Sequence, residues 1–414
     1  MSCADECLEF LSTSATSEVE ERHGAQESCH RQADAVKRRV AECRVVGLRS
    51  VQPRRLKAPC NVVVILASVC LLAASACGGP SRSKEAPGLV ERSRVSMGTE
   101  VHISAWTTDE AAAVTAFDKA FNEFDRLDAL MSTWKAGSDI TRLNDAAGTV
   151  AVPVSVEVRE VLHASQEVSE WTGGKFDVTF AALSGLWKFD HDIDGHVPDR
   201  AEIAPRLPLI DYRALTIDDR AGTASLARAG MKVNLGGIGK GYAIDRAVSI
   251  LRDAGLSDFL VQSGGDLFAA GKRGDRPWRV GIQDPRGAPD TLFAALEITD
   301  AAFSTSGDYE RFFIRDGHRY HHILDPDTGE PAARSRSVSI LAKSTTVTDG
   351  LSTGVFILGG DEGMALIEKL PDVEGVIVTA ENRVLVSSGL KGRLVQLEAP
   401  SEWRPGARGC RPCG

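Results

Sequence analysis

Residues 234–245 read NLGGIGKGYAID, so four glycines surround one lysine just before a helical pattern. Glycine lets main-chain N–H groups approach an anion with no Cβ in the way, the start of the next helix adds partial positive charge, and Lys240 adds a full one. The spacing fits neither the P-loop, because Gly241 stands where Ser or Thr is required, nor the G-x-G-x-x-G pattern. By itself the stretch predicts either an anion-binding loop or a glycine-rich turn that begins a helix.

The segments on either side of this loop mix helical and strand patterns without regular alternation, which favours an α+β fold over a doubly wound sheet. One helix is expected to start at a capping box formed by Thr107 and Glu110, a second to cover residues 156–171, and a third to run from the glycine loop to Gly255. Residues 376–378 and 384–386 are apolar runs typical of a late hairpin. We expect one mixed α/β domain over residues 91–400.

Composition limits the possible functions. The chain has 414 residues, of which 43% are hydrophobic, as in a globular protein. Residues 78–414 carry 38 Lys and Arg against 48 Asp and Glu. Because binding to nucleic acid needs a basic face, this acidic excess predicts no nucleic-acid partner.

Seven of the nine cysteines lie in residues 1–77 and the other two in the last five residues. The folded body is therefore expected to lack disulfides and thiolate metal sites. Cys410 and Cys413 form one CxxC, which could be a redox or zinc pair, but without a second half such a motif is more often incidental.

Residues 61–76 are an apolar run that follows Arg54, Arg55 and Lys57 and ends in small residues before Cys77. This pattern predicts a signal peptide over residues 51–77, with Cys77 as a lipobox cysteine; plain cleavage or an uncleaved anchor is the alternative. Residues 1–50 are expected to be a poorly ordered extension. Since a signal rarely starts so far into a chain, we expect translation to begin near residues 46–51. Residues 78–90 should form a flexible tether, and residues 401–414 a tail.

Several polar residues follow apolar runs. Asp266 comes after a strand pattern and Gly264-Gly265, so its carboxylate could bind ribose hydroxyls or cap the next segment. Ser306 lies in a polar turn over residues 304–311 that lines a site or connects strands. His321 and His322 are adjacent, so on a strand only one can face a given site. One could act as a general base, while the alternative is a satisfied or exposed side chain.

Asp349 and Thr353 are four residues apart. On a helix they lie on one face and offer two oxygens to a hard cation such as Mg²⁺. On spacing alone, N-capping by Asp349 or Thr348 is favoured over metal binding.

Taken in order, these segments resemble the FAD:protein FMN transferase family, also called the ApbE family, over most of residues 94–370. The matching blocks are Met97-Gly98-Thr99, residues 130–134 with 138–144, residues 174–179, the glycine loop, Gly264-Gly265-Asp266, residues 305–309, residues 322–326 with Thr328-Gly329, and Asp349 with Thr353. The resemblance implies an ApbE-like mixed α/β catalytic domain preceded by a signal and lipobox segment.

The resemblance also implies an activity. The enzyme would bind FAD and Mg²⁺, split the pyrophosphate, transfer FMN to a Thr or Ser of a partner redox protein, and release AMP. It would work on the periplasmic side of a bacterial membrane, anchored through a lipid on Cys77. Some similar proteins instead hydrolyse FAD to FMN and AMP, or mainly hold the flavin. The identity of the acceptor lies on another chain.

Three groups of site residues follow from the resemblance by matching position. The Mg²⁺ ligands would be Asp349, Thr353 and a main-chain carbonyl of the glycine loop, Gly239. His322 would be the base acting on the acceptor hydroxyl, held or oriented by Asp325. The FAD contacts would be Lys240 with Gly237 and Gly239 at the diphosphate, Trp134 and Met97 at the flavin, Asp245 and Asp266 at hydroxyls, and Ser306. Trp134 stands where the family often has Tyr, and Asp266 where Glu is also common.

These assignments agree with the chemistry of the reaction. A diphosphate is negatively charged, so attack by a neutral hydroxyl needs a cation to neutralise developing charge and an acceptor for the proton. Lys240, Mg²⁺ at Asp349 and Thr353, and His322 would supply them.

Overall fold

The computed structural model describes residues 86–190, 192–288 and 291–402. The predicted extension, signal peptide and lipobox Cys77 lie outside the described residues, as do Cys410 and Cys413. Strand β1 begins at Gly88 and pairs with β2, so the predicted tether ends earlier than residue 90.

The elements named below have these bounds. The helices are α2 (Glu110–Met131), α3 (Asp139–Asp145), α4 (Val156–Trp171), α5 (Arg200–Ile203), α6 (Gly239–Asp253), α7 (Thr345–Leu358) and α8 (Gly360–Lys369). The large sheet contains β1 (Gly88–Ser96), β2 (Thr99–Thr107), β6 (Phe259–Ser263), β7 (Asp266–Ala270), β10 (Ala301–Gly307), β13 (Ser335–Ala342), β14 (Glu374–Thr379) and β15 (Val384–Val386). The smaller sheets contain β8 (Trp278–Gln283), β9 (Leu292–Ile298) and β16 (Val395–Gln396), then β3 (Val152–Pro153), β4 (Leu215–Asp218) and β5 (Thr223–Leu226), and the pair β11 (Phe312–Arg315) and β12 (His318–His321).

The eight strands of the large sheet follow the order β1-β2-β6-β7-β10-β13-β14-β15, and each neighbouring pair is antiparallel. A doubly wound fold needs parallel strands joined by crossover helices. The α+β prediction is therefore confirmed, and the predicted late hairpin is the β14–β15 pair.

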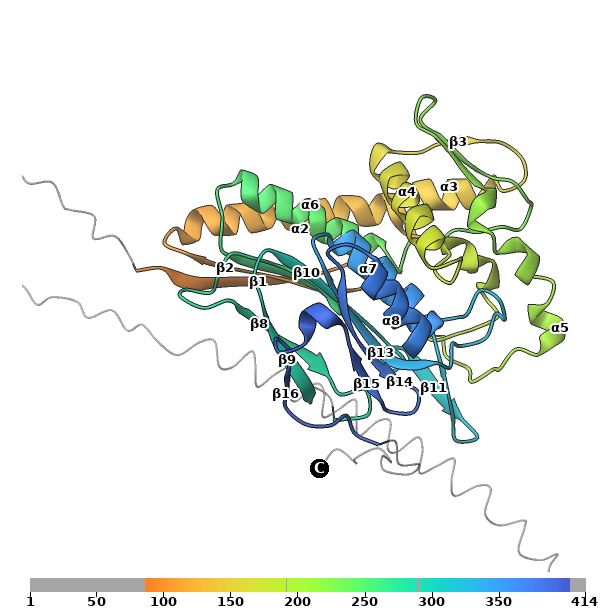
Figure 1. Cartoon of the computed structure of the whole chain (residues 1–414). Coiled ribbons are helices and arrows are strands. Elements are labelled where there is room, and N and C mark those ends of the chain that lie inside the picture. Colours follow the sequence, from red (N-terminus) through yellow and green to blue (C-terminus); the bar gives the residue numbers. More distant parts are fainter. Residues whose placement is uncertain (1–85, 191, 289–290, 403–414) are drawn as a thin grey trace, which may run out of the picture. The chain divides into compact units, whose positions relative to one another are not determined.

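Helices α2, α6, α7 and α8 lie over one face of this sheet (Figure 1). Side chains alternate between the two faces along each strand. On β7, for example, Phe268 and Ala270 pack in the core under α2 and α6, while Leu267 and Ala269 pack on the other face against β8 and β9. Polar side chains on the helix side, such as that of Asp266, therefore face α6 and α7.

The helix predictions hold in extent, but one cap is wrong. Helix α4 has the predicted bounds, and α2 buries Phe117, Phe121 and Phe124. The N-cap of α2 is Asp109, which accepts from the backbone N–H of Ala112, whereas the hydroxyl of Thr107 accepts from the backbone of Asp109. Thr107 and Asp109 could both accept from the free N–H groups at the start of α2, and Asp109 does so because it lies directly before the helix.

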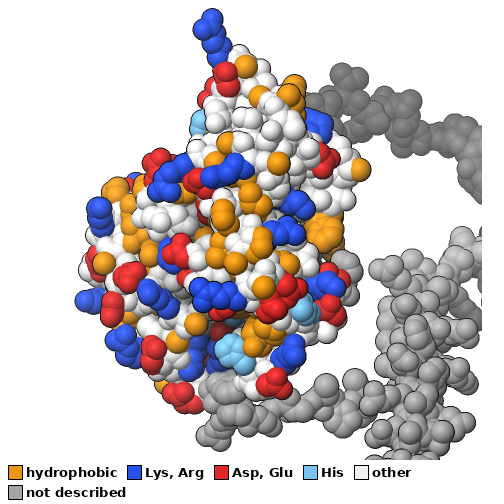
Figure 2. Space-filling model, turned by 90° about the vertical axis from the view of Figure 1, so that its right-hand side faces the viewer, with side chains coloured by type: hydrophobic (Ala, Val, Ile, Leu, Met, Phe, Trp, Pro, Cys, Tyr) orange, Lys and Arg blue, Asp and Glu red, His pale blue; other side chains and the backbone are white. Residues whose placement is uncertain are grey.

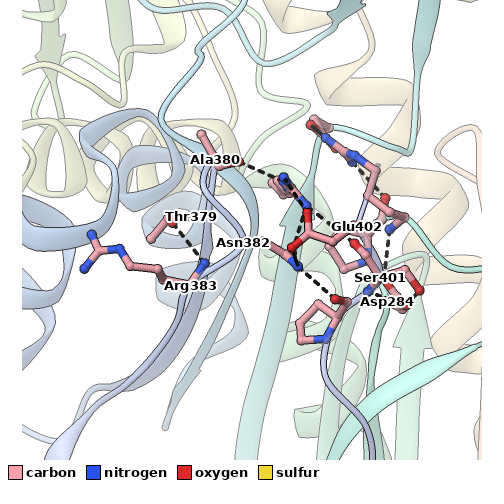
Figure 3. A network of polar contacts seen from close by, with 12 residues as sticks. Asp284, Thr379, Ala380, Asn382, Arg383, Ser401 and Glu402 are labelled. Carbon is pink, nitrogen blue, oxygen red and sulfur yellow. Dashed lines mark hydrogen bonds and ion pairs between the residues drawn. The ribbon is translucent and has the colours of Figure 1, made fainter. Parts of the chain in front are cut away.

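The last described residues are fixed to the domain (Figure 3). Ser401 donates its backbone N–H and its hydroxyl to the buried carboxylate of Asp284, and the side chain of Asn382 donates to the carbonyl of Pro400 at 2.8 Å and to Glu402 at 3.1 Å. The ordered domain thus continues slightly past the predicted boundary at residue 400.

The surface carries both signs of charge. On the face in Figure 2, Lys and Arg side chains lie among Asp and Glu, with hydrophobic side chains between them. Within the described ranges, none of the helices combines the length and the apolar character that crossing a bilayer requires.

Candidate active site

Helices α6 and α7 cross at Gly241, inside the glycine stretch. A Cβ added at Gly241 would lie 2.2 Å from the carbonyl oxygen of Thr345 and 2.8 Å from the Cβ of Asp349. No side chain fits at those distances, so glycine is required at this crossing. Glycine here lets the first turn of α6 approach α7, which brings Lys240 and Asp349 together.

Gly241→Ala is expected to lower the free energy of unfolding by about 2–3 kcal/mol, because the added methyl meets backbone that cannot rotate away. Urea unfolding of the purified variant measures this. Gly88→Ala is the matched control, since a Cβ there has nothing within 4 Å. An unchanged midpoint for Gly241→Ala would show that the helices can separate at little cost.

Three charged side chains form the centre of the site. The ammonium of Lys240 lies 2.8 Å from an oxygen of Asp266 on β7 and 3.2 Å from an oxygen of Asp349 on α7. The other oxygen of Asp349 accepts the backbone N–H of Gly241 at 2.9 Å. Both carboxyl groups are buried, so two acidic side chains share one ammonium. We call Lys240, Asp266 and Asp349 the charge cluster.

The charge cluster shifts the ionisation of its members. Burial opposes the charge on Lys240, but Asp266 and Asp349 outweigh it and raise the pKa of the ammonium above its ordinary value. Burial, followed by the charge of Asp266, raises the pKa of Asp349. Lys240 therefore stays cationic, and the two carboxylates form an environment that favours a further cation.

Hydroxyl groups extend the site along α7. Ser304 on β10 contacts Thr348 at 2.7 Å, and Ser306, two residues on, contacts Ser352 at 2.8 Å and Thr353 at 3.2 Å. The two serines lie on the helix face of β10. These contacts hold Thr353 on the same face of α7 as Asp349, as predicted. The N-cap of α7 is Ser344, so the alternative in which Asp349 or Thr348 caps the helix is wrong.

The residues around Asp349 suit Mg²⁺. They offer a carboxylate, the hydroxyls of Thr353 and Ser306, and loop carbonyls, which are the hard oxygen donors that Mg²⁺ prefers. The excess of carboxylates over lysine in the charge cluster fits a cation as well. Within the described ranges, no group of three or more His, Cys, Asp or Glu side chains is close enough to hold a metal. A magnesium site here would therefore rely on hydroxyl, carbonyl and substrate oxygens besides Asp349.

The glycines of the loop have different positions. Gly237 lies beside Thr353: its added Cβ would be 3.8 Å from the threonine hydroxyl. Gly239 is the first residue of α6, so its carbonyl points along the helix. The loop carbonyl that reaches the charge cluster is that of Gly236, 3.4 Å from the Lys240 ammonium. The carbonyl of Gly236 thus faces a cation already, and Gly239 stays the predicted carbonyl ligand.

Asp245 holds the start of α7. Its two oxygens accept from the hydroxyl of Ser344, the backbone N–H groups of Thr345 and Thr346, and the hydroxyl of Thr346, at 2.7–2.9 Å. A carboxylate at a helix N-terminus is favourable because the free N–H groups need acceptors. These contacts fix the start of α7, and with it Asp349, while the role of Asp245 at an FAD hydroxyl stays a prediction.

Met97, one of the two predicted flavin contacts, lies near the glycine loop. A Cβ added at Gly239 would be 3.8 Å from the methyl of Met97 and 3.7 Å from the sulfur of Met131, the last residue of α2. Met97 has a left-handed backbone, with φ of 51°. Trp134 follows three residues after Met131, and 79% of it is exposed. The role of Trp134 at the flavin stays a prediction.

The two adjacent histidines differ in their contacts. The ring of His321 is buried, with Nε2 at 2.8 Å from the carbonyl of Ala332 and Nδ1 accepting from the backbone of Ile323. Nδ1 of His322 lies 3.3 Å from the carbonyl of Arg311. Because a carbonyl only accepts, Nδ1 of His322 carries the proton, which leaves Nε2 free to accept one. His321 is thus a satisfied core residue and His322 the candidate base.

His322 is kept neutral. Burial lowers its pKa to about 3, and the positive charge of Arg311 acts in the same direction.

The predicted orienting role of Asp325 is not supported by its contacts. Both oxygens of Asp325 accept from the ammonium of Lys175, at 2.8 and 3.0 Å, and the ring contact on His322 comes from Arg311.

Sequence reasoning gave no role to Ser352, Gly236 or Lys175. Thr348 and Ser352 are four residues apart on α7, and they contact Ser304 and Ser306, which are two apart on β10. The contact of Ser352 could therefore be predicted only once β10 is known to pack on α7. Lys175 directly follows the Gly173-Gly174 helix stop, a position that signals a turn and gives no sign of its partner.

Comparison with known proteins adds independent evidence. Residues 97–377 match the sequence model of the ApbE family. The FAD:protein FMN transferase of Treponema pallidum is 34% identical over 363 residues, which cover 83% of this chain and 98% of that protein. The ApbE protein of Thermotoga maritima has a similar structure, with a TM-score of 0.68 and 33% identity over 74% of this chain and 99% of that one. The flavin transferase ApbE of Vibrio cholerae has a TM-score of 0.67 and 29% identity over 74% of this chain and 99% of that one.

Proposed function

The chain belongs to the ApbE family and shares the FAD:protein FMN transferase activity of its relatives; we propose that it uses Mg²⁺, a Thr or Ser acceptor on a redox protein, and release of AMP. The observation that supports this most is the charge cluster, in which Lys240, Asp266 and Asp349 meet beside a glycine loop at a helix N-terminus. Such a centre suits a diphosphate bridged to a divalent cation.

The proposed reaction uses residues of this chain as follows. The glycine loop and Lys240 hold the FAD diphosphate, with Met97 and Trp134 at the flavin. The acceptor hydroxyl oxygen attacks the phosphorus of the FMN half, its proton goes to Nε2 of His322, and the bond between this phosphorus and the AMP oxygen breaks. FMN becomes a phosphoester of the acceptor, and AMP leaves.

Asp349, Thr353 and the main-chain carbonyl of Gly239 would hold Mg²⁺, and the hydroxyl of Ser306 lies 3.2 Å from that of Thr353. When bound, the ion supplies charge neutralisation on the diphosphate. Lys240 would contribute in the same way, because its raised pKa keeps the ammonium protonated.

We also propose that the enzyme acts on the periplasmic side of a bacterial membrane, exported by the segment over residues 51–77 and anchored through a lipid on Cys77. The absence of cysteine from residues 78–409 suits an oxidising compartment. Globomycin, which blocks lipoprotein signal cleavage, should cause the precursor to accumulate in the producing cell. A native chain in which mass spectrometry finds no lipid on Cys77 would contradict the lipid anchor.

The test of the activity is incubation of the full chain with FAD, MgCl₂ and candidate periplasmic redox subunits. A covalently fluorescent acceptor band together with AMP is the expected result, and mass spectrometry of the band then maps the modified Thr or Ser. AMP with only free FMN would indicate an FAD diphosphatase instead. Bound FAD with neither product would indicate a protein that holds the flavin.

The pKa of His322 leads to a pH prediction. A base must be neutral to accept a proton, and kcat/KM reports the free enzyme. With a pKa of about 3, His322 stays neutral throughout the acidic range in which an ordinary histidine becomes charged. At saturating MgCl₂, kcat/KM for FAD should therefore change little between about pH 5 and pH 7. If kcat/KM instead falls about twofold as the pH is lowered to about 6.5, and His322→Ala removes this fall, His322 has the pKa of an ordinary histidine.

A further inference from the structure

The turn after α4 touches three separate parts of the site. The chain reverses at Gly173 and Gly174, whose φ angles are 63° and 89°, and the backbone N–H of Phe176 donates to the hydroxyl of Thr172 at 3.0 Å. This hydrogen bond closes the turn. It points Lys175 and Phe176 toward different neighbours.

Phe176 and Thr172 contact the metal and diphosphate side. A Cβ added at Gly237 would be 3.3 Å from the ring of Phe176. A Cβ added at Gly354, the residue after Thr353, would be 2.5 Å from the methyl of Thr172 and 3.2 Å from the Cβ of Phe176. The turn is therefore packed directly against the glycine loop and α7.

Lys175 contacts the histidine side. Its ammonium lies 2.8 and 3.0 Å from the oxygens of Asp325 and 2.8 Å from an oxygen of Asp327. The side chains of Lys175 and Asp325 are each 21% exposed, so water screens this pair only in part. Burial opposes the charge of Lys175, but the hydrogen bonds and charges of Asp325 and Asp327 outweigh it and raise its pKa.

The segment that carries His322 is held at two ends. At one end, the backbone N–H of His322 donates to the carbonyl of Arg311 at 3.1 Å. At the other, Asp325 forms a tight turn, in which its carbonyl accepts from Gly329 at 2.7 Å and its N–H donates to Glu330 at 2.8 Å. Lys175 is the charged contact between this turn and the turn after α4.

We propose that Lys175 is a positioning residue for the transfer step: by holding Asp325, it fixes the segment carrying the proposed base His322 against the glycine loop and α7 that bind the diphosphate. The inference rests on the proposed role of His322. It assigns Lys175 an effect on the chemical step, because the base must meet the acceptor hydroxyl while the diphosphate is held elsewhere. FAD binding, which uses the glycine loop, should be almost independent of Lys175.

The test compares Lys175→Met and Lys175→Arg with the native chain, with Lys188→Met as the matched control. Lys188 forms an exposed ion pair with Asp194 and takes no part in the site. AMP release at saturating MgCl₂ gives kcat and KM for FAD, with the subunit labelled in the flavinylation experiment as acceptor. Quenching of flavin fluorescence gives FAD affinity.

Lys175→Met should lower kcat by about 10- to 100-fold and change the FAD affinity by less than about threefold, since small misplacement of a base costs rate and not binding. Lys175→Arg should restore most of the rate, because its guanidinium can pair with Asp325. Asp325→Asn should resemble Lys175→Met, and the double variant should be no slower than either single one. Asp325→Asn keeps the test valid if Lys175→Met folds poorly.

The decisive comparison is made in the His322→Ala background. If Lys175 acts through His322, adding Lys175→Met there should change kcat by less than about twofold. Two results would contradict the role of Lys175 and leave the proposed base intact. One is a fall in kcat of about 10- to 100-fold when Lys175→Met is added to His322→Ala, and the other is a native kcat in the single variant Lys175→Met. Native transfer by His322→Ala contradicts the proposed base, and the inference fails with it.

Discussion

Replacing Asp349 by Asn is expected to abolish Mg²⁺-dependent AMP release, with kcat lower by at least about 10³-fold, while the fold is kept. Asparagine matches the size of aspartate, but it is neutral and one of its two polar groups is a donor, so it is a poor ligand for a hard cation. Lys240 still has Asp266 at 2.8 Å, so the variant leaves one buried ammonium paired with one buried carboxylate.

The measurement is AMP release from FAD across a MgCl₂ titration, with calorimetric titration of Mg²⁺ in the presence of FAD as a readout besides activity. Asp361→Asn is the control, because Asp361 is an exposed acidic side chain in the first turn of α8. Thermal unfolding of both variants should stay cooperative. Native Mg²⁺ dependence in Asp349→Asn would remove Asp349 from the metal site.

Local structure could be predicted where neighbouring residues decide it. Helix α4 follows from its apolar periodicity and the Gly173-Gly174 stop, and the β14–β15 hairpin from two apolar runs joined by a polar turn. Glycine at position 241 could be recognised as unusual from sequence. The reason for it, the carbonyl of Thr345 at the helix crossing, requires the packing of α6 on α7.

Contacts between distant residues could not be predicted from composition or spacing. Lys240 meets Asp349 across 109 positions and Lys175 meets Asp325 across 150, and no local pattern encodes either pair. The resemblance to a family supplied the residues at the charge cluster. It assigned Asp245 to FAD but did not reveal that the oxygens of Asp245 accept from the start of α7, where free N–H groups favour a carboxylate.

The order of the strands in the sheet could not be predicted from the sequence either. Alternating patterns identify strands such as β7 and β10, but they do not reveal that these two are neighbours. That neighbour relation places Asp266 and Ser304 opposite each other on the face below α7. The site is therefore a product of sheet order, which depends on long-range pairing, and only its separate pieces are visible in the sequence.

His322→Ala should leave FAD affinity within about threefold of the native value and lower the rate of transfer to the acceptor by about 10²- to 10⁴-fold, the range that one positioned base contributes. The ring is neutral, its Nδ1 faces the carbonyl of Arg311, and Nε2 is left as the only nitrogen able to accept a proton. His163→Ala is the control, because His163 lies on α4 and pairs with Asp219 on the surface.

Two readouts separate the role of a base from that of a binding residue. Fluorescence of the acceptor band measures transfer, and quenching of free flavin fluorescence measures FAD affinity. Small imidazole added to His322→Ala should restore part of the transfer, since it can occupy the space of the lost ring and accept the proton. If transfer is unchanged, proton removal depends on another group, and His321 is a poor replacement because both of its ring nitrogens contact backbone. If affinity and transfer fall together, His322 acts in binding.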